Sequence, residues 1–146
     1  LSKMTEIQTP IDLGQTDQTH RRKVLTKLVA SGNFDALGRM GIHVIEEEGV
    51  PYECCHQAAF PPSHYPKDIP SNAIRTWPTV DSPQPNDIVI YINQESGVVT
   101  HVGRVVDQGK VKSRWGLQGI LCEHSPLDVP IYCGEEIEIV YYREPI

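Results

Sequence analysis

The sequence lacks the features of a membrane-spanning or nucleic-acid-binding protein. No run approaches the roughly 18 apolar residues of a membrane helix, and the N-terminus lacks the charged-then-apolar pattern of a signal peptide. Basic residues are scarce, with 13 Lys and Arg against 19 Asp and Glu and a formal net charge of −6. Because nucleic acids and anionic membranes attract basic proteins, neither is expected as a partner. The location stays open, since a chain that begins with Leu1 fits a processed form or a domain of a longer or secreted protein.

The sequence also has few cysteines, and they are poorly placed for disulfides. They are Cys54, Cys55, Cys122 and Cys133. The adjacent cysteines cannot easily form a disulfide with each other. A chain of 146 residues can bury enough apolar surface to fold without disulfide bonds. We therefore expect reduced thiols in a single domain over residues 16–146, preceded by a polar lead-in over residues 1–15.

The first part of this domain has helical patterns. Apolar residues form one stripe over Asp17–Ala30, which a glycine at position 32 terminates. A second apolar stripe predicts a helix over Phe34–Glu48, although two glycines interrupt it. Prolines punctuate Pro61–Pro85 too often for a long helix or a central strand.

The second part of the domain has strand patterns. Residues of high β-propensity alternate with turn residues, which predicts strands over Asp87–Asn93, Thr100–Val106, Lys110–Trp115 and Glu135–Arg143. The residues Cys122–His124 also alternate as in a strand. The sequence thus predicts an α+β domain with N-terminal helices packed on a small antiparallel sheet.

One predicted hairpin fixes which side chains share a face. If Asp107–Gly109 is a three-residue loop with a left-handed glycine, Val106 pairs with Lys110, and Gly103 then lies opposite Ser113. We expect the inward face to carry His101, Gly103, Val105, Val111, Ser113 and Trp115. The other face should be solvated and carry Val102, Arg104, Val106, Lys110, Lys112 and Arg114. This register places His101 on the inward face at the mouth of its strand, a position that suits a base in a cleft.

The cysteine pair opens a short predicted helix. The run Tyr52–Phe60 ends at two prolines, so a helix fits between the cysteines and Pro61. A thiol at a helix N-terminus has a lowered pKa, because the helix dipole and unpaired amides stabilise the thiolate. A buried structural cysteine is the alternative interpretation of the same residues.

Taken together, these motifs resemble the NlpC-like and CHAP-like branch of the papain-like thiol hydrolases. The resemblance rests on a cysteine that opens a helix, the strand Asn86–Tyr91, the run His101–Gly103 and the run Ser113–Gly116. It covers about Tyr52 to Arg143 and implies a papain-like core. It also implies a cysteine-dependent peptidase or amidase that cleaves an amide bond through a thioester.

The resemblance assigns roles to individual residues. Cys55 would be the nucleophile, His101 its base and Ser113 the third catalytic residue, which fixes the imidazole. Cys54 remains the alternative nucleophile, and His124 the alternative third residue. The oxyanion would be held by the amide of Cys55 and a second, unassigned donor, for which Tyr52 is a candidate.

Two other functions compete with this hypothesis. Zinc could be held by members of the set Cys54, Cys55, His56, Cys122 and His124, although their spacing differs from that of common zinc sites. The domain could also be a non-catalytic binding module on the same fold. We expect no cofactor and no metal. The expected partner is a peptide or amide substrate, such as a cell-wall peptide or a target protein.

Overall fold

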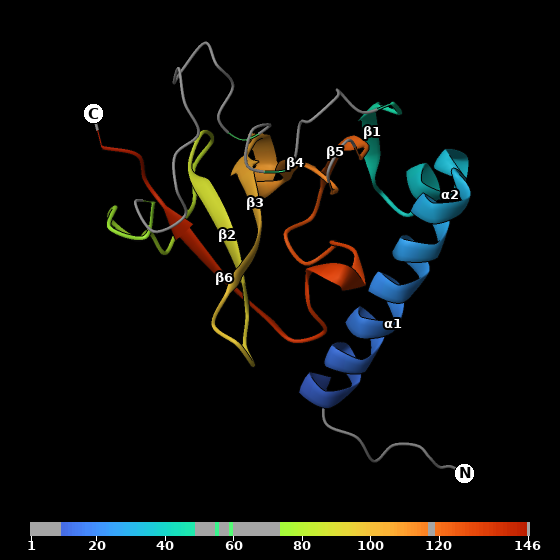
Figure 1. The fold of residues 1–146 in the computed structure, drawn as a ribbon, viewed down its shortest axis with the longest axis horizontal. Coiled ribbons are helices and arrows are strands. Elements are labelled where there is room, and N and C mark those ends of the chain that lie inside the picture. The colour runs from blue at the N-terminus through green and yellow to red at the C-terminus, as the bar shows by residue number, and fades with distance from the viewer. Residues whose placement is uncertain (1–9, 49–54, 56–58, 60–73, 117–118, 146) are drawn as a thin grey trace.

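A computed structural model describes residues 10–48, 55, 59, 74–116 and 119–145. It contains a long helix and a six-stranded antiparallel sheet, so the predicted α+β class is confirmed (Figure 1). The helices are α1 (Pro10–Ser31) and α2 (Phe34–Arg39). The strands are β1 (His43–Glu46), β2 (Ile88–Asn93), β3 (Val99–Val105), β4 (Val111–Arg114), β5 (Leu121–His124) and β6 (Ile137–Tyr142). Short 3-10 turns are η2 (Asp107–Gly109) and η3 (Ile131–Cys133).

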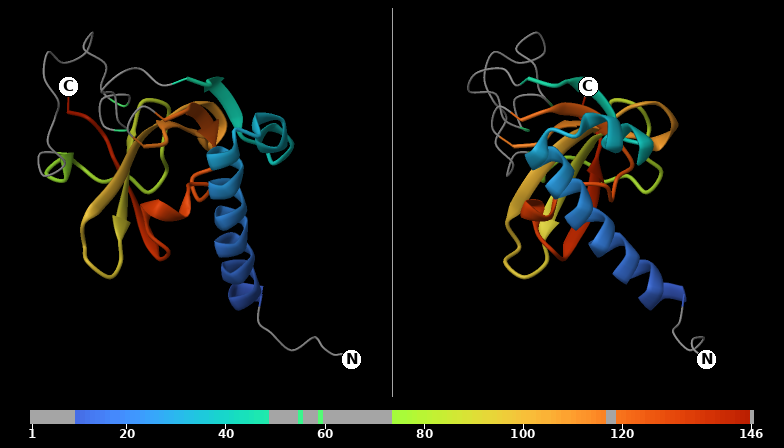
Figure 2. Two further views of the ribbon diagram at one scale, coloured as in Figure 1. Left: turned by 45° about the vertical axis from the view of Figure 1, so that its right-hand side comes forward. Right: turned by 90° about the vertical axis from the view of Figure 1, so that its right-hand side faces the viewer.

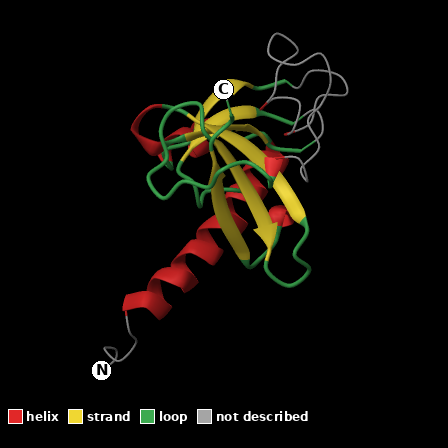
Figure 3. Ribbon diagram, turned by 90° about the vertical axis from the view of Figure 1, so that its left-hand side faces the viewer, coloured by secondary structure: helices red, strands yellow, loops and turns green. Residues whose placement is uncertain are grey.

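The strand order in the sheet is β1-β5-β4-β3-β2-β6. The four strands β2 to β5 therefore form an antiparallel meander, while β6 returns to pair with β2 at the far edge. Helix α1 lies near the β1 and β5 end of the sheet, and its first turns extend beyond the strands (Figures 2 and 3). The sheet is the framework on which the candidate site is built.

The predicted helix over Phe34–Glu48 is wrong beyond Arg39. The chain turns at Gly41, whose φ of +88° is the left-handed conformation that glycine adopts without strain, and it continues as β1. Strand β1 then pairs with β5, with Val44 opposite Cys122. Both Phe34 and Val44 pack against the same core as Leu37. Apolar residues of α2 and of β1 thus pack into the same core, and their combined spacing resembles the stripe of a single helix.

Helix α1 is longer than predicted and is held by its polar residues. It begins at Pro10, so residues 10–15 are helical, although they were predicted to belong to a polar lead-in.

The buried guanidinium of Arg22 donates hydrogen bonds to four backbone carbonyls around η3, at distances of 2.5–3.1 Å. They belong to Val129, Pro130, Gly134 and Glu135. Arg22 therefore fixes the connection between β5 and β6.

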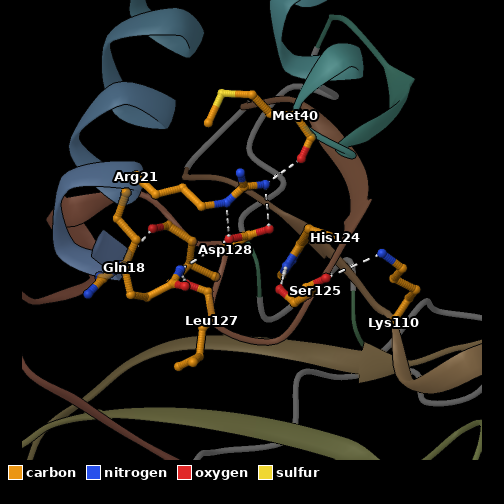
Figure 4. A network of polar contacts seen from close by, with 10 residues as sticks. Gln18, Arg21, Met40, Lys110, His124, Ser125, Leu127 and Asp128 are labelled. Atoms are coloured by element: carbon orange, nitrogen blue, oxygen red, sulfur yellow. Dashed lines mark hydrogen bonds and ion pairs between the residues drawn. The ribbon is translucent and has the colours of Figure 1, made fainter. Parts of the chain in front are cut away.

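A second arginine on α1 reinforces this attachment. Arg21 binds both carboxylate oxygens of Asp128, at 2.8 Å from Nε and 3.0 Å from Nη2, and also donates to the carbonyl of Met40 (Figure 4). The amide of Gln18 donates to Asp128 at 3.1 Å as well. The segment that follows β5 is thus tied to α1 by charged and amide side chains.

We expect an Arg22→Lys variant to lower the free energy of unfolding by about 2–4 kcal/mol. A lysine ammonium lacks the planar fork that reaches several carbonyls at once, and each buried carbonyl left without a donor costs about 1–3 kcal/mol. Urea denaturation measures the change. Lys23→Ala is the matched control, because Lys23 is an exposed neighbour whose nearest acidic oxygen, on Glu135, lies 3.9 Å away. Equal stability of the two variants would contradict the role of Arg22.

The predicted hairpin register between β3 and β4 is confirmed. Arg104 pairs with Lys112 and Val105 with Val111, and the amide of Val106 donates to the carbonyl of Lys110 at 2.8 Å. Gly109 has a φ of +73°, as the predicted loop requires. The alternation of faces therefore follows the prediction.

The prediction that the basic face of this hairpin is solvated holds for Lys112, which is exposed, and is wrong for Val102 and Arg114, which are buried. Val102 is buried in a core with Ala59 and Ile74. Arg114 is only 1% exposed, donates to the carbonyl of Gly119 at 2.7 Å and pairs with Glu46 of β1 at 2.5 Å. The cause is non-local, because residues from distant parts of the chain cover this face. Both faces of the central sheet are consequently packed.

Candidate active site

Three polar side chains meet on the inward face of adjacent strands. His101 lies on β3, Ser113 on β4 and His124 on β5, and we call them the inner polar cluster. They are 2%, 1% and 0% exposed, respectively. Gly103 allows this packing, since a Cβ at that position would lie 2.6 Å from Cγ1 of Val111 and 3.2 Å from Cβ of Ser113. The prediction that His101 and Ser113 share the inward face is confirmed, and the structure adds His124 to that face.

The structure joins Ser113 to His124. The Ser113 Oγ lies 2.6 Å from Nε2 of His124, and Nδ1 of the same ring lies 2.8 Å from the carbonyl oxygen of Ser125 (Figure 4 draws the second contact). A carbonyl oxygen can only accept, so Nδ1 carries the hydrogen and Nε2 is bare. The Ser113 hydroxyl therefore donates to His124. Burial lowers the pKa of His124 to about 4, which keeps its ring neutral near pH 7.

His101 is the least satisfied member of the cluster. Its Nε2 is buried, and no described residue forms a hydrogen bond with it. Burial, followed by the nearby His124, lowers its pKa to about 3, so the imidazole is neutral near pH 7. The ring packs against Tyr91 with centroids 5.2 Å apart. A neutral imidazole is the form that can accept a proton from a thiol.

The three described cysteines differ in accessibility. Cys122 and Cys133 are buried, whereas Cys55 is partly exposed, and none of these three described cysteines is part of a disulfide. Burial raises the pKa of Cys133 to about 12 and also raises that of Cys122. The two buried thiols are therefore poor nucleophiles at neutral pH.

Cys55 lies in the neighbourhood of two residues of η3, Tyr132 and Cys133. Residues 55 and 59 both have helical conformation, in agreement with a helix in this segment. The charge of a Cys55 thiolate contributes to the raised pKa of Cys133 and of Tyr132, so Cys55 lies near both. Cys133 in turn accepts a 2.5 Å hydrogen bond at its carbonyl from Thr100, the neighbour of His101. The pairing of Cys55 with His101 itself stays a prediction.

The other predicted site residues have different outcomes. Cys54, His56 and Tyr52 lie outside the described residues. Among the described contacts, the Ser113 hydroxyl bonds to His124. Its predicted role, to orient the imidazole of His101, stays a prediction. Tyr91 was not predicted as a site residue, and its hydroxyl donates to the carbonyl of Pro126 at 2.5 Å. The largely apolar sequence of β2 gives no signal that distinguishes it.

Within the described ranges, no group of three or more His, Cys, Asp or Glu residues is arranged to hold a metal ion. Two members of the suggested zinc set, Cys54 and His56, are not among these residues. No helix in the described part of the chain is long and apolar enough to cross a membrane.

Comparisons with known proteins add no relative. No protein-family model matches the sequence, and no curated protein is significantly similar to it. The resemblance to NlpC-like and CHAP-like hydrolases therefore rests on the short motifs alone.

Proposed function

We propose that this chain is a cysteine-dependent peptidase or amidase with a papain-like core, in which Cys55 is the nucleophile and His101 the base. One observation carries the proposal: the buried, neutral imidazole of His101 packs against Tyr91, which shares a core with Cys133, and the partly exposed Cys55 is near enough to Cys133 for its charge to add to the effect of burial on the pKa of that thiol. His101 and Cys133 both adjoin Tyr91, which supports a common site for the base and the nucleophile.

The chemistry follows from the protonation states. His101 takes the proton of the Cys55 thiol as the sulfur attacks the carbonyl carbon, and the proton then passes to the leaving amine as the carbon–nitrogen bond breaks. The thioester that remains is hydrolysed by a water, whose proton His101 accepts, and the thiol is restored. The low pKa of His101 disfavours a permanent ion pair with the thiolate, so His101 accepts the proton only as the sulfur attacks. The amide of Cys55 would stabilise the oxyanion.

A binding module without turnover is the second candidate. The near-complete burial of His101 favours it, because a base that is 2% exposed has little access to substrate. The two functions differ in the reactivity of Cys55, since a module without turnover does not need an activated thiol.

Brief treatment with iodoacetamide near neutral pH tests the proposal. We expect Cys55 to be alkylated first, because it is partly exposed and is proposed to have a base beside it, whereas the buried Cys122 and Cys133 should react at least about tenfold more slowly. Mass mapping of the labelled peptides gives the order.

Two variants complete this experiment. In the His101→Ala variant, the labelling of Cys55 should slow about tenfold or more, while Cys133→Ser should leave it unchanged. Faster labelling of Cys54 would move the nucleophile by one residue. Slow labelling of all cysteines would favour the binding module.

A further inference from the structure

Strand β6 forms one edge of the sheet, and a described segment covers that edge only toward the C-terminal end of the strand (Figure 1). There the amide of Val80 donates to the carbonyl of Tyr141 at 3.0 Å, and Thr79 forms a bridge with Tyr142. Toward its N-terminal end, β6 pairs with β2 on one side and has no strand among the described residues on the other.

The backbone groups of β6 alternate between β2 and the outer edge. The amide of Gln94 donates to the carbonyl of Glu136 at 2.9 Å, so the even-numbered residues direct their backbone groups toward β2. The odd-numbered residues direct theirs outward, as Tyr141 does. The amide and carbonyl of Ile139 therefore point outward, and no described residue bonds to either. The carbonyl of Ile137 points the same way and is reached only by the exposed side chain of Gln94, at 3.5 Å. An open stretch of strand edge thus lies at Ile137–Ile139, and such an edge is a template for another strand.

Acidic side chains surround the N-terminal end of this open stretch. The exposed Glu138 lies between Ile137 and Ile139, which are half-buried and pack against the core. Just before β6, a hollow of about 240 Å³ is lined by Asn93, Glu95, Glu135 and Glu136. Lys23 lies 3.9 Å from Glu135, and no other basic residue in the described ranges forms an ion pair with these glutamates. The local charge is therefore negative and favours a basic partner.

A second copy of the chain is a poor partner for this edge. Antiparallel pairing of two β6 strands must align odd-numbered residues with each other, because only these have outward backbone groups. Centred on Glu138, such pairing places the two copies of this glutamate opposite each other, and centred on Ile137 it places Glu138 opposite Glu136. Like charges directly opposite are destabilising. Centred on Ile139, the pairing would need the carbonyl of Tyr141, which is already bonded.

We propose that Ile137–Ile139 is a docking site for an extended basic peptide segment, which adds to the sheet as a further strand antiparallel to β6. Backbone groups of its apolar residues bond to those of Ile137 and Ile139 and displace the side chain of Gln94. One lysine or arginine lies opposite Glu138, and a second, two residues away, reaches the acidic hollow before β6. The partner is thus a segment in which basic and apolar residues alternate. This site does not depend on the proposed hydrolase activity.

Hydrogen exchange followed by NMR measures whether the edge is open. In the isolated chain, the amide of Ile139 should exchange at least about tenfold faster than those of Glu138 and Val140, which face β2. The probe is an acetylated and amidated peptide of about seven residues in which lysine and valine alternate. Its addition should slow the exchange of the Ile139 amide and shift its resonance.

Altered peptides separate backbone pairing from charge. The valine amides of the bound peptide would face β6, so N-methylation of the valines should weaken binding at least about tenfold. The lysine amides would face away, and their N-methylation should leave the affinity within about threefold of the parent peptide. Replacement of the lysines by glutamates should weaken binding at least about tenfold, because like charges then meet at Glu138.

Charge reversal in the chain provides a matched pair of variants. Glu138→Lys should weaken binding of the lysine–valine peptide about tenfold. Glu47→Lys changes the net charge equally but lies after β1, at the opposite edge of the sheet, and should bind the peptide as the wild-type chain does. Thermal unfolding checks that both variants are folded.

Several results would overturn the proposal. Slow exchange of the Ile139 amide in the dilute chain would mean that the edge is already covered. Exchange that slows as the protein concentration rises, together with dimers in sedimentation, would mean that a second copy covers it. The site would also be wrong if the lysine–valine peptide does not bind, or if N-methylation of its valines or exchange of its lysines for glutamates leaves binding unchanged. Each result is independent of the reactivity of Cys55, so failure of this site and failure of the hydrolase are distinguishable.

Discussion

Replacement of Cys55 with alanine is expected to abolish amide hydrolysis. The proposed thioester needs the sulfur, and loss of a nucleophile or of its base typically costs a factor of about a thousand or more in turnover. His101→Ala should cause a loss of turnover of similar size, because no base then removes the proton of the Cys55 thiol. Release of peptides from a mixed peptide library and from cell-wall peptides, followed by mass spectrometry, measures the activity.

Matched variants show whether the loss is chemical. Cys133→Ala removes a buried thiol from the same region and should keep most of the turnover, since that thiol has a pKa near 12 and stays protonated. Thermal unfolding of each variant checks that the fold is intact. A Cys55→Ala variant that still hydrolyses amides at the wild-type rate would exclude the thiol mechanism. A wild-type chain with an unreactive Cys55 and no hydrolysis would instead favour the binding module.

The parts of the fold that depend on local signals could be predicted from the sequence. The register of β3 and β4 follows from a three-residue loop with a left-handed glycine at position 109, and both the turn and the alternation lie within some fifteen residues. That register correctly placed His101 and Ser113 on one face. A helix was also predicted around Cys55; residues 55 and 59 are helical, and the other residues of that run lie outside the described part of the chain.

The parts that depend on distant residues could not be predicted. Strand β1 exists because Val44 pairs with Cys122, more than seventy residues further along the chain, and no local pattern contains that partner. The hydrogen bonds from Arg22 to the carbonyls near η3 join residues that are 107 and 108 positions apart in the sequence. Arginines on a helix surface usually remain solvated, so a buried one is visible only once its carbonyl partners are in place.

The candidate site shows the same division. The sequence identified Ser113 and His124 as competing third residues, because it showed each on a strand but not how β4 and β5 align. The observed pairing of Val111 with His124 and of Ser113 with Cys122 makes Ser113 and His124 diagonal neighbours on the same face. A hydrogen bond of 2.6 Å then joins two residues that had seemed to be alternatives.

The same buried imidazoles predict a loss of stability in mild acid. His101 and His124 have folded-state pKa values of about 3 and about 4, below the value of about 6.5 expected for an unfolded chain. As the pH falls below about 6.5, these histidines bind protons in the unfolded state but stay neutral in the folded state. The stabilisation is therefore present above that pH and is lost progressively as the pH falls toward the folded-state values.

The expected loss is large compared with the stability of a small domain. When the pH falls from about 7 to about 5, each histidine that stays unprotonated in the folded state but is protonated in the unfolded state reduces the free energy of unfolding by about 2 kcal/mol. Asp87, whose pKa is lowered chiefly by its hydrogen bond with Arg143, contributes only at lower pH. Over the first two pH units, the two histidines should thus dominate the loss.

Urea denaturation at a series of pH values measures this effect. His124→Gln should flatten the dependence on pH by about half, because it removes one of the two buried imidazoles and retains an acceptor for Ser113. His20→Gln, at an exposed position of α1, is the matched control and should leave the curve unchanged. A wild-type stability that stays constant from about pH 7 to about pH 5 would mean that the imidazoles are charged or solvated. In that case His101 would not be the buried, neutral base that the proposed mechanism requires.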